Sequence, residues 1–491
     1  MERKAKIVAT IGPASQDESV IERLLLAGMN VARLNFSHGT QAEHAARISS
    51  LRRVSARLSR PIAILQDLQG PKIRVGELAA PLTLKAGQKV TLYAQDDGGR
   101  WTTDDPSTSL RASGRWTTED GSIPVDFLEL FGSVKAEDRI LLDDGRIELV
   151  VLEVSACVAK AQVKTGGVLL SHKGINLPGA RLDMPAFTGK DEADLTFGLS
   201  KGVDAVAVSF VRRAEDMKRV RQAIERQSSQ AHPLLIAKLE RPEALECLDE
   251  ILAVSDGVMV ARGDLGVEMP PEDVPVAQKC VIQSANRSGK LVITATQMLD
   301  SMVHNPLPTR AEASDVANAI FDGTDAVMLS AETAVGDYPL ESVAMMDKII
   351  RQAEANFDAW GHLQGLESKE RDDAASLARA ARELAHDRDV AAIAVFTRTG
   401  RTAALMAKAR SRVPVLAFTP EETTYRRMAM FWGVIPQRVP FADTVEKMIS
   451  HVEAALKSSG LVQPGQQVVV ISGFPVGEMR PPNMALLHTV Q

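Results

Sequence analysis

The sequence predicts a (β/α)₈ barrel that is interrupted by an all-β insertion and followed by a smaller α/β domain. Eight short runs of mainly aliphatic residues recur along the chain, and a helical pattern follows each of them except the third. Such runs are typical of parallel strands that are buried on both faces. The runs cover residues 6–12, 31–37, 61–68, 204–210, 234–240, 257–264, 291–297 and 325–331.

The first strands of the predicted barrel show how strands and helices alternate. Residues 6–12 precede a helical pattern that stops at Gly28, and glycine is common directly after a helix. Residues 31–37 lead into a long amphipathic stretch at 40–58. The third strand, 61–68, has no helix after it, and the alternation resumes only beyond the insertion.

The insertion and the C-terminal part have patterns of their own. The insertion is rich in Gly, Thr and Asp and contains alternating runs such as KVTLYAQ and RIELVVLEVS, which predict a separate all-β domain with an exposed loop at 99–116. Beyond it, helical stretches and apolar runs at 390–397, 413–419, 434–439 and 466–472 predict an α/β domain with a mainly parallel sheet. The expected boundaries are 1–70 and 169–345 for the barrel, 71–168 for the insertion and 346–491 for the C-terminal domain.

Composition excludes several other classes of protein. A net charge of −6 disfavours nucleic acid or an anionic membrane as the partner. The cysteines Cys157, Cys247 and Cys280 are widely spaced, which argues against disulfides and a structural zinc site and for a reducing compartment. The chain enters a strand directly without an apolar signal segment, and no run is long enough to span a bilayer. We therefore expect a cytoplasmic protein.

Polar residues end several of the predicted strands. Lys238 and Glu240 end one run, Asp264 ends the next and Thr296 follows another. Because the carboxyl ends of barrel strands carry the active site, this pattern indicates an enzyme. Glu240 and Asp264 suit Mg²⁺, unless each only caps a helix or pairs with an arginine. Lys238 lies on the same side as Glu240 and must pair with it or with an anion such as a phosphoryl group or an enolate. Thr296 is either a pocket hydroxyl or purely structural.

A second group of polar residues lies on the strand at 31–37. Arg33, Asn35 and Ser37 alternate, so their side chains share one face of that strand. We interpret Arg33 as a phosphate clamp, because a planar guanidinium matches phosphate oxygens. The alternative is that Arg33 only balances the charge of Asp67.

The known phosphate-loop and nucleophile motifs do not occur in the sequence. It contains no GxxxxGK[ST] loop, no protein-kinase motif and no GxSxG elbow. A different candidate anion site is the segment TRTGRTA at 397–403, which joins a predicted strand to a helix. Its threonines and the helix N-terminus suit a bound anion, or they may serve only to cap the helix.

Longer motifs cover the predicted barrel almost end to end. They are TIGPAS (10–15), RLNFSHG (33–39), HKGINLPG (172–179), IAKLERPEAL (236–245), MVARGDLGVE (259–268), TATQMLDSM (294–302), PTRAEASDVANAI (308–320) and DGTDAVMLSAETAVGDYP (322–339). With these motifs, in this order, the chain resembles the pyruvate kinase family. The order of barrel, inserted β-domain and C-terminal α/β domain agrees with that resemblance.

The resemblance implies transfer of the phosphoryl group of phosphoenolpyruvate to ADP, giving pyruvate and ATP in the last step of glycolysis. It implies that Glu240 and Asp264 bind Mg²⁺, for which Mn²⁺ could substitute, and that Lys238 stabilises the transferring charge. Arg74 would help to close the insertion as a lid. The implied substrate contacts are Arg33, Lys238, Gly263, Asp264 and Thr296, and the implied nucleotide contacts are Thr10, Pro13, Arg33, His38 and Lys173.

One position departs from the pattern of many members of the family. Those members need K⁺ and carry a glutamate where this chain has Lys72. The residues that correspond to their K⁺ ligands are Asn35, Ser37, Asp67 and Leu68. We expect the Lys72 ammonium to replace the mobile cation, as in the lysine-type branch of the family, so that K⁺ is not required. Otherwise Lys72 is a solvated lid residue.

The resemblance also bears on regulation and assembly. The segment at 397–403 resembles the family's allosteric phosphate loop, which implies a phosphorylated effector such as a sugar monophosphate or AMP. The residues concerned are Thr397, Arg398, Thr399, Gly400, Arg401 and Thr402. The family also implies a homotetramer.

Two other classes of function share part of this pattern. A different Mg²⁺-enolate barrel enzyme, such as a carbon–carbon lyase or a phosphoenolpyruvate mutase, needs similar acidic and basic residues but no ADP contacts. A non-catalytic metabolite sensor would keep the fold but would be free to lose Lys238. A lyase or mutase would consume phosphoenolpyruvate without a nucleotide, whereas the kinase requires ADP. A sensor would keep its function when Lys238 is substituted, whereas the kinase would lose turnover.

Overall fold

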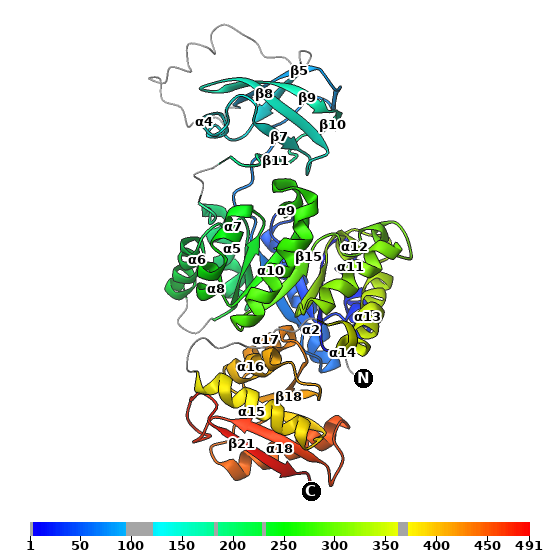
Figure 1. Ribbon diagram of the computed structural model, residues 1–491, viewed down its shortest axis with the longest axis vertical. Helices are drawn as coiled ribbons and strands as arrows, with labels where there is room; N and C mark the ends of the chain where they lie inside the picture. Colours follow the sequence, from blue (N-terminus) through cyan, green and yellow to red (C-terminus); the bar gives the residue numbers. More distant parts are fainter. Residues whose placement is uncertain (1–2, 95–120, 181–184, 228–231, 362–371) are drawn as a thin grey trace.

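The computed structural model describes residues 3–94, 121–180, 185–227, 232–361 and 372–491. Three bodies follow one another along its long axis, with the inserted domain at one end, the barrel in the middle and the C-terminal domain at the other end (Figure 1). The expected loop at 99–116 lies outside the described residues. No helix in the described ranges has both the length and the apolar character needed to cross a membrane.

The central body is a closed barrel of eight parallel strands, in the order β1-β16-β15-β14-β13-β12-β3-β2. The strands are β1 (Lys6–Thr10), β2 (Val31–Asn35), β3 (Ala63–Asp67), β12 (Ala205–Val208), β13 (Leu234–Leu239), β14 (Gly257–Ala261), β15 (Leu291–Ala295) and β16 (Ala326–Leu329). All eight coincide with the runs expected from the sequence, so the predicted fold class is confirmed. Fully buried aliphatic side chains such as Val8, Leu65, Ile236 and Ile293 fill the barrel.

Helices surround the barrel and start where side chains satisfy their free amide groups. Thr40, Thr188 and Thr309 each accept a hydrogen bond from the third helical residue, whose own carboxylate bonds back to the threonine amide. Gly28 directly follows the first helix with a φ of 123°, so the predicted helix stop is confirmed. The main helices are α1 (Glu18–Ala27), α2 (Gln41–Leu58), α5 (Gly189–Ser200), α6 (Ala214–Gln227), α7 (Pro242–Glu246), α8 (Leu248–Val254), α9 (Arg262–Glu268), α10 (Val274–Arg287), α11 (Arg310–Phe321), α12 (Ala331–Ala334), α13 (Pro339–Ala355) and α14 (Phe357–Trp360).

The inserted domain is built of β-strands around a core of its own, as expected. A six-stranded sheet in the order β11-β7-β8-β9-β5-β6 lies beside a two-stranded sheet, β10-β4. The sheet extends beyond the expected boundary at residue 168, because Ile175 of β11 pairs with Leu142 of β7. The elements are β4 (Leu82–Leu84), β5 (Lys89–Ala94), β6 (Ser122–Val125), α4 (Leu130–Ser133), β7 (Arg139–Leu142), β8 (Ile147–Ser155), β9 (Val158–Thr165), β10 (Gly167–Leu169) and β11 (Ile175–Asn176).

The C-terminal domain is a five-stranded sheet in the order β19-β18-β17-β20-β21 with helices against it. The first four strands are parallel and match the expected runs, whereas β21 is an antiparallel edge strand that the sequence reading missed. Its residues are half-buried or exposed, so no buried run marks it. The elements are α15 (Asp373–Asp387), β17 (Ala392–Phe396), α16 (Arg401–Ala409), β18 (Val415–Thr419), α17 (Glu422–Arg427), β19 (Val434–Arg438), α18 (Val445–Ser459), β20 (Gln467–Ser472) and β21 (Met484–Thr489).

A buried charge cluster joins the C-terminal domain to the amino ends of the barrel strands. Lys408, near the end of α16, pairs with Asp325 at 2.5 Å, and Arg410 pairs with the same carboxylate at 2.8 Å. Asp325 directly precedes β16 and also accepts a hydrogen bond from the amide of Val292 in β15. Burial lowers the pKa of Lys408 to about 8. The C-terminal domain is therefore attached at the end of the barrel opposite to the insertion (Figure 1).

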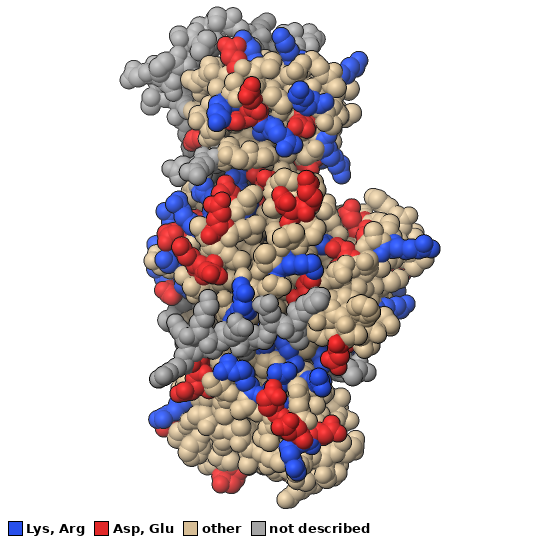
Figure 2. Space-filling model, viewed as in Figure 1, with Lys and Arg blue, Asp and Glu red and all other residues tan. Residues whose placement is uncertain are grey.

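Charge is mixed rather than segregated on the outer surface. On the face shown in Figure 2, Lys and Arg side chains are interspersed with Asp and Glu side chains over all three bodies. That face carries no broad basic patch of the kind that binds a polyanion.

Candidate active site

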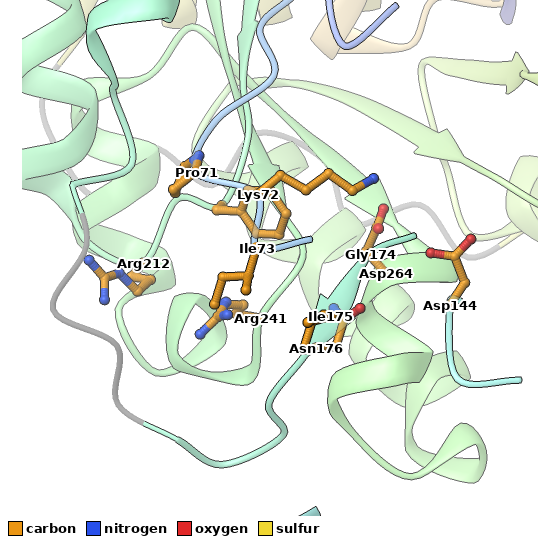
Figure 3. Close-up of a pocket in the computed structure, with 11 residues that line it drawn as sticks. Pro71, Lys72, Ile73, Asp144, Gly174, Ile175, Asn176, Arg212, Arg241 and Asp264 are labelled. Atoms are coloured by element: carbon orange, nitrogen blue, oxygen red, sulfur yellow. The ribbon is translucent and has the colours of Figure 1, made fainter. Parts of the chain in front are cut away.

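The polar residues expected at the strand ends lie together where the barrel meets the inserted domain. The pocket shown in Figure 3 is lined from both sides, by barrel residues such as Asp264 and by residues of the insertion such as Asp144. An adjoining pocket is lined by Gly263, Asp264 and Thr296. The chain therefore places its candidate site between the carboxyl ends of the strands and the inserted domain.

Lys238 is the centre of a buried charge network. Its ammonium lies 2.7 Å from Oε1 of Glu240 and 3.3 Å from Oδ1 of Asp67, and it donates a 2.7 Å hydrogen bond to the Ser209 hydroxyl. Arg33 pairs with the other oxygen of Asp67 at 2.6 Å. Arg33 does balance the charge of Asp67, which was the alternative to a phosphate clamp. The same pair also places Arg33 beside Lys238, so Arg33 remains part of the site.

The charges of this network fix its protonation. Burial alone would lower the pKa of Lys238, but the carboxylates of Asp67, Glu240 and Asp264 raise that pKa above its usual value. Burial alone would raise the pKa of Asp67, but Lys238 and Arg33 hold it below its usual value. Lys238 is therefore a protonated cation at neutral pH, held by three partners at the carboxyl end of β13.

Glu240 and Asp264 have the chemistry of a divalent metal site. Burial raises the pKa of Glu240 to about 7, and the nearby negative charge of Asp264 adds to that rise. A divalent cation between the two carboxylates would remove this repulsion, so the residues present fit Mg²⁺. No group of three or more potential metal ligands occurs among the described residues. Such an ion would thus complete its shell from water and substrate, as Mg²⁺ commonly does.

Thr296 lies directly after β15 and contacts the start of α9. Its hydroxyl accepts a 2.7 Å hydrogen bond from the Gly263 amide and donates one of 2.6 Å to the Ala295 carbonyl. A Cβ on Gly263 would lie 3.3 Å from that hydroxyl, so the glycine permits the close approach. The expected neighbourhood of Gly263, Asp264 and Thr296 is present.

Ser209 is a site residue that the sequence reading missed. Its hydroxyl accepts the hydrogen bond from Lys238 and donates a 2.7 Å bond to the carbonyl of Leu68, an expected K⁺-ligand equivalent. The signal was present, because Ser209 ends the apolar run of β12 just as Lys238 and Thr296 mark the ends of theirs.

The insertion's own candidate residues are bonded within the insertion. Lys173 pairs with Asp143 at 2.8 Å, and the Arg74 guanidinium donates to the carbonyl of His172 at 2.9 Å. One link from the insertion to the barrel is a 3.0 Å hydrogen bond from Asn176 of β11 to Glu268, the last residue of α9.

The remaining barrel candidates surround the network. Thr10 accepts a 3.0 Å hydrogen bond from Arg33, and the Asn35 side chain accepts one of 3.1 Å from the Ser37 amide. Burial lowers the pKa of His38, and the charges of Lys72, Arg74 and Arg33 add to that effect. Pro13 lies in the turn after β1, in the same loop as Gly12 and Ser15.

Lys72 lies at the junction of insertion and barrel. It lines both pockets together with Asp264 and Asp144, and Figure 3 shows it extending toward those carboxylates and away from Arg212. Within the described ranges it forms no ion pair. Its positive charge therefore faces the pocket.

The C-terminal loop forms a separate pocket. Thr397 and Thr399 accept hydrogen bonds from the amides of Gly400 and Arg401 at the start of α16. Gly400 has a φ of 88°, which favours glycine at this turn. The pocket is lined by residues that include Thr397, Arg398, Thr399, Arg401, Thr402, Ser472, Gly473, Glu478 and Arg480.

The fold and the site together define a (β/α)₈ barrel with a charged pocket between its strand ends and an inserted domain, an arrangement typical of barrel enzymes. Comparison with known proteins identifies the family. The model of the pyruvate kinase barrel domain matches residues 2–343, and that of the pyruvate kinase alpha/beta domain matches residues 375–488. The chain belongs to the pyruvate kinase family, and it is therefore a phosphotransferase.

Individual relatives agree over the whole length. The chain is 44% identical over 500 residues to a pyruvate kinase of Geobacillus stearothermophilus, covering 100% of this chain and 81% of the relative. It is 41% identical over 494 residues to one of Clostridium acetobutylicum, with both chains covered completely. A crystal structure of a pyruvate kinase from Cryptosporidium parvum is similar with a TM-score of 0.87 at 34% identity, covering 100% of this chain and 96% of that one.

Proposed function

We propose that this enzyme transfers the phosphoryl group of phosphoenolpyruvate to ADP and releases pyruvate and ATP, as the last step of glycolysis in the cytoplasm. The observation that carries the proposal is the buried network of Lys238, Arg33, Asp67 and Glu240 at the carboxyl ends of β13, β2 and β3. The cations Lys238 and Arg33 of this network would attract a polyanionic substrate. The three cysteines are free, which agrees with a reducing compartment.

The network suits the charge that develops during phosphoryl transfer. Lys238 stays protonated and immobile, so it can stabilise negative charge on the transferring group without reorganisation. Arg33 is held by Asp67 with further donors available for phosphate oxygens. Glu240 and Asp264 would hold Mg²⁺, or Mn²⁺ with the same oxygen ligands, and this ion neutralises charge on the bound substrates.

Substrate orientation and protonation fall to the start of α9 and the end of β15. Gly263, Asp264 and Thr296 line one pocket, where they would hold the substrate carboxylate. The Thr296 hydroxyl would lie near the methylene carbon of the enolate, which takes up a proton while the enolate oxygen becomes the carbonyl of pyruvate. Solvent supplies that proton through the hydroxyl.

The nucleotide would lie between barrel and insertion. Thr10, Pro13, Arg33 and His38 on the barrel side and Lys173 on the other would contact it. Because Lys173 and Arg74 are bonded within the insertion, closure would bring them to the nucleotide as one unit. Such closure excludes water, which would otherwise compete with ADP as the acceptor.

Lys72 is the basis for the proposed independence from K⁺. Its ammonium faces the pocket near Asp264 and lies close enough to affect His38. The expected K⁺-ligand equivalents, Asn35, Ser37, Asp67 and Leu68, belong to the β2 and β3 ends of the same site. One fixed positive charge would then serve where other members recruit a mobile one.

The C-terminal pocket is the proposed effector site. Thr397, Arg398, Thr399, Gly400, Arg401 and Thr402 form its anion-binding side. Arg398 lies 3.5 Å from Glu421, and Arg480 pairs with Glu478 at 2.7 Å on the opposite side. Arg480, the cation outside the loop, already has Glu478 as its partner and is not available for a second phosphate group. We therefore expect a monophosphate, such as a sugar monophosphate or AMP, and not a bisphosphate.

Assembly as a homotetramer is also part of the proposal. An apolar groove on α11, α13 and α14 is lined by Ala317, Phe321, Ile349, Ala353 and Trp360. Trp360 is 66% exposed in the single chain. A second copy would cover this face, and light scattering would report the mass of the assembly.

The experiment that tests the proposed function is pyruvate release from phosphoenolpyruvate in K⁺-free buffer with Mg²⁺, with and without ADP. Pyruvate release only with ADP supports the kinase, whereas consumption of phosphoenolpyruvate without any nucleotide would indicate a lyase or a mutase. Adding K⁺ tests the role of Lys72, and adding glucose 6-phosphate or AMP tests the effector site. No release under any of these conditions would favour the sensor.

A further inference from the structure

Two consecutive residues at the end of β15 adopt a backbone conformation that is rare for their side chains. Thr296 has a φ of 67° and Gln297 a φ of 54°, both in the left-handed region. A β-branched residue such as threonine strongly disfavours this region, so surrounding contacts must hold it there. The strained turn is the segment that aims the Thr296 hydroxyl.

Arg262 is the residue that binds this turn. Its Nη2 donates a 2.8 Å hydrogen bond to the Thr296 carbonyl and contacts Sδ of Met298 at 2.7 Å, and its Nε donates a longer 3.4 Å bond to the Ala295 carbonyl. One guanidinium therefore bonds residues on both sides of the strained peptide. Water alone could not hold both carbonyls in fixed positions.

Arg262 is itself locked from its other side. Its Nη1 lies 2.7 and 2.6 Å from the two carboxylate oxygens of Asp315 in α11, and 3.3 Å from the Gln278 side chain in α10. The Arg262 side chain is only 9% exposed. Arg262 borders the same pocket as Thr296, but Asp315 neutralises its guanidinium and holds it against α11. We therefore expect Arg262 to act on the substrate through Thr296.

The same stretch of chain also fixes the hydroxyl. Gly263, which follows Arg262, donates its amide to the Thr296 hydroxyl, and Asp264 comes next. Thr296 is thus held at its carbonyl by the side chain of Arg262 and at its hydroxyl by the adjacent backbone. A shift of Arg262 would move the hydroxyl relative to the Asp264 carboxylate.

We propose that Arg262 is a positioning residue that sets the Thr296 hydroxyl for protonation of the enolate, with Asp315 as its anchor. This inference rests on the proposed function. The half-reaction concerned is reversible: a C–H bond of the pyruvate methyl group breaks, the proton passes to solvent, and a solvent proton forms the new bond. In D₂O this half-reaction exchanges methyl hydrogens for deuterium.

The test measures deuterium uptake into pyruvate by NMR, with Mg²⁺ and ATP present, for the wild type and for Arg262→Ala. The variant should lose about 10- to 100-fold in methyl exchange, the scale of a small misplacement of a reacting group, with the KM for ADP unchanged. Millimolar guanidinium should restore part of the exchange, and the same concentration of methylammonium should not, because only a planar fork spans the carbonyls and Asp315.

Arg221→Ala is the matched control. Arg221 of α6 likewise donates to one carboxylate, Asp256 at 2.9 Å, and to one backbone carbonyl, that of Val254 at 3.4 Å. These partners lie before the amino end of β14, at the end of the barrel away from the site. The rate of methyl exchange in the Arg221→Ala variant should equal that of the wild type.

Wild-type exchange in a folded Arg262→Ala variant, as judged by its unfolding temperature, would overturn the proposal. If that variant does not fold, the Arg262→Lys variant provides the test. Lysine keeps the positive charge beside Asp315 but lacks the planar fork, so methyl exchange should still fall. Undiminished exchange in Arg262→Lys would overturn the proposal. Failure of the proposed function has a different signature, because the wild type would then neither form ATP nor exchange pyruvate.

Discussion

At the scale of single residues, the site concentrates charges that would be costly if they were unpaired. Lys238 lies among the carboxylates of Asp67, Glu240 and Asp264, and Arg33 pairs with Asp67. Arg33, Asp67, Lys238 and Glu240 are almost completely buried, so each of these charges depends on its neighbours. The same arrangement leaves the cations fixed in place for an incoming phosphate.

Replacing Lys238 by methionine should lower turnover by about 100- to 1,000-fold or more, because one preorganised charge is lost from the transition state. The variant should also lose about 3–5 kcal/mol of stability, since Asp67 and Glu240 would be left buried without their partner. Steady-state kinetics and denaturant unfolding measure the two effects. Lys290→Met, which removes a half-buried lysine at the amino end of β15, is the control and should keep its turnover. Undiminished turnover of Lys238→Met would contradict the assigned role.

Replacing Lys72 by glutamate should make the enzyme dependent on K⁺. The substitution removes the fixed cation from the pocket and adds a carboxylate beside Asp264, so a mobile cation becomes necessary. Turnover in tetramethylammonium buffer should fall and should recover when K⁺ is added. Lys89→Glu, on the exposed surface of the insertion, should leave both rates unchanged. A Lys72→Glu variant that is equally active in both buffers would remove the argument for an internal cation.

At the scale of elements, α9 links three parts of the site. It carries Gly263 and Asp264, its first residue binds the turn after β15, and its last residue, Glu268, accepts a hydrogen bond from Asn176 of the insertion. Arg241 lies 3.9 Å from Glu268 and adds a second charge to this junction. The insertion is therefore bonded to the helix that we propose holds the substrate.

Substitution of Asn176 by leucine should weaken docking of the insertion. A hydrogen bond to a charged group contributes about 1.5–3 kcal/mol, so the KM for ADP should rise by roughly tenfold or more while the unfolding temperature stays near that of the wild type. Initial-rate kinetics at varied ADP provide the measurement. Asn305→Leu removes an exposed local hydrogen bond from the barrel and should have no effect. An unchanged KM in Asn176→Leu would show that this contact does not control the insertion.

Elements with continuous apolar runs could be predicted from the sequence, and those without could not. The eight barrel strands are buried on both faces, so their composition alone marks them. The edge strand β21 buries little, and β11 has only two residues, so neither forms a continuous apolar run. Within the site, Lys238 and Glu240 were predictable from their spacing. The contact of Lys238 with Asp67 depends instead on strand order, because β12 pairs with both β3 and β13 and so brings their ends close together.

At the scale of the whole molecule, α16 connects the proposed effector pocket to the barrel. It begins at Gly400 and Arg401 beside that pocket, and at its other end Lys408 and Arg410 bind Asp325. Asp325 in turn bonds the start of β15, whose far end leads to Thr296. A displacement of this helix would reach the barrel through the Asp325 carboxylate and through Asn286 of α10, which Lys408 and Arg410 also bind.

Lys408, at the interface between the C-terminal domain and the barrel, should make the stability of the folded chain depend on pH. Its pKa is about 8 in the folded chain, whereas an unfolded lysine has the ordinary value of 10.5. Between these values the unfolded chain binds the extra proton, so a rise in pH across this window stabilises the folded state. The unfolding temperature of the wild type should therefore rise relative to that of Lys408→Met as the pH goes from about 8 to about 10. A difference that is constant or shrinks would contradict this assignment.

We propose that the network at the barrel strand ends passes a phosphoryl group from phosphoenolpyruvate to ADP with the help of a divalent metal. Phosphorus NMR on the wild-type enzyme tests it most directly, because it follows both phosphates at once. We expect phosphoenolpyruvate to disappear and ATP to appear in equal amounts, with both changes stopped by EDTA and restored by excess Mg²⁺. Loss of phosphoenolpyruvate without matching ATP, or turnover that persists in EDTA, would contradict the account.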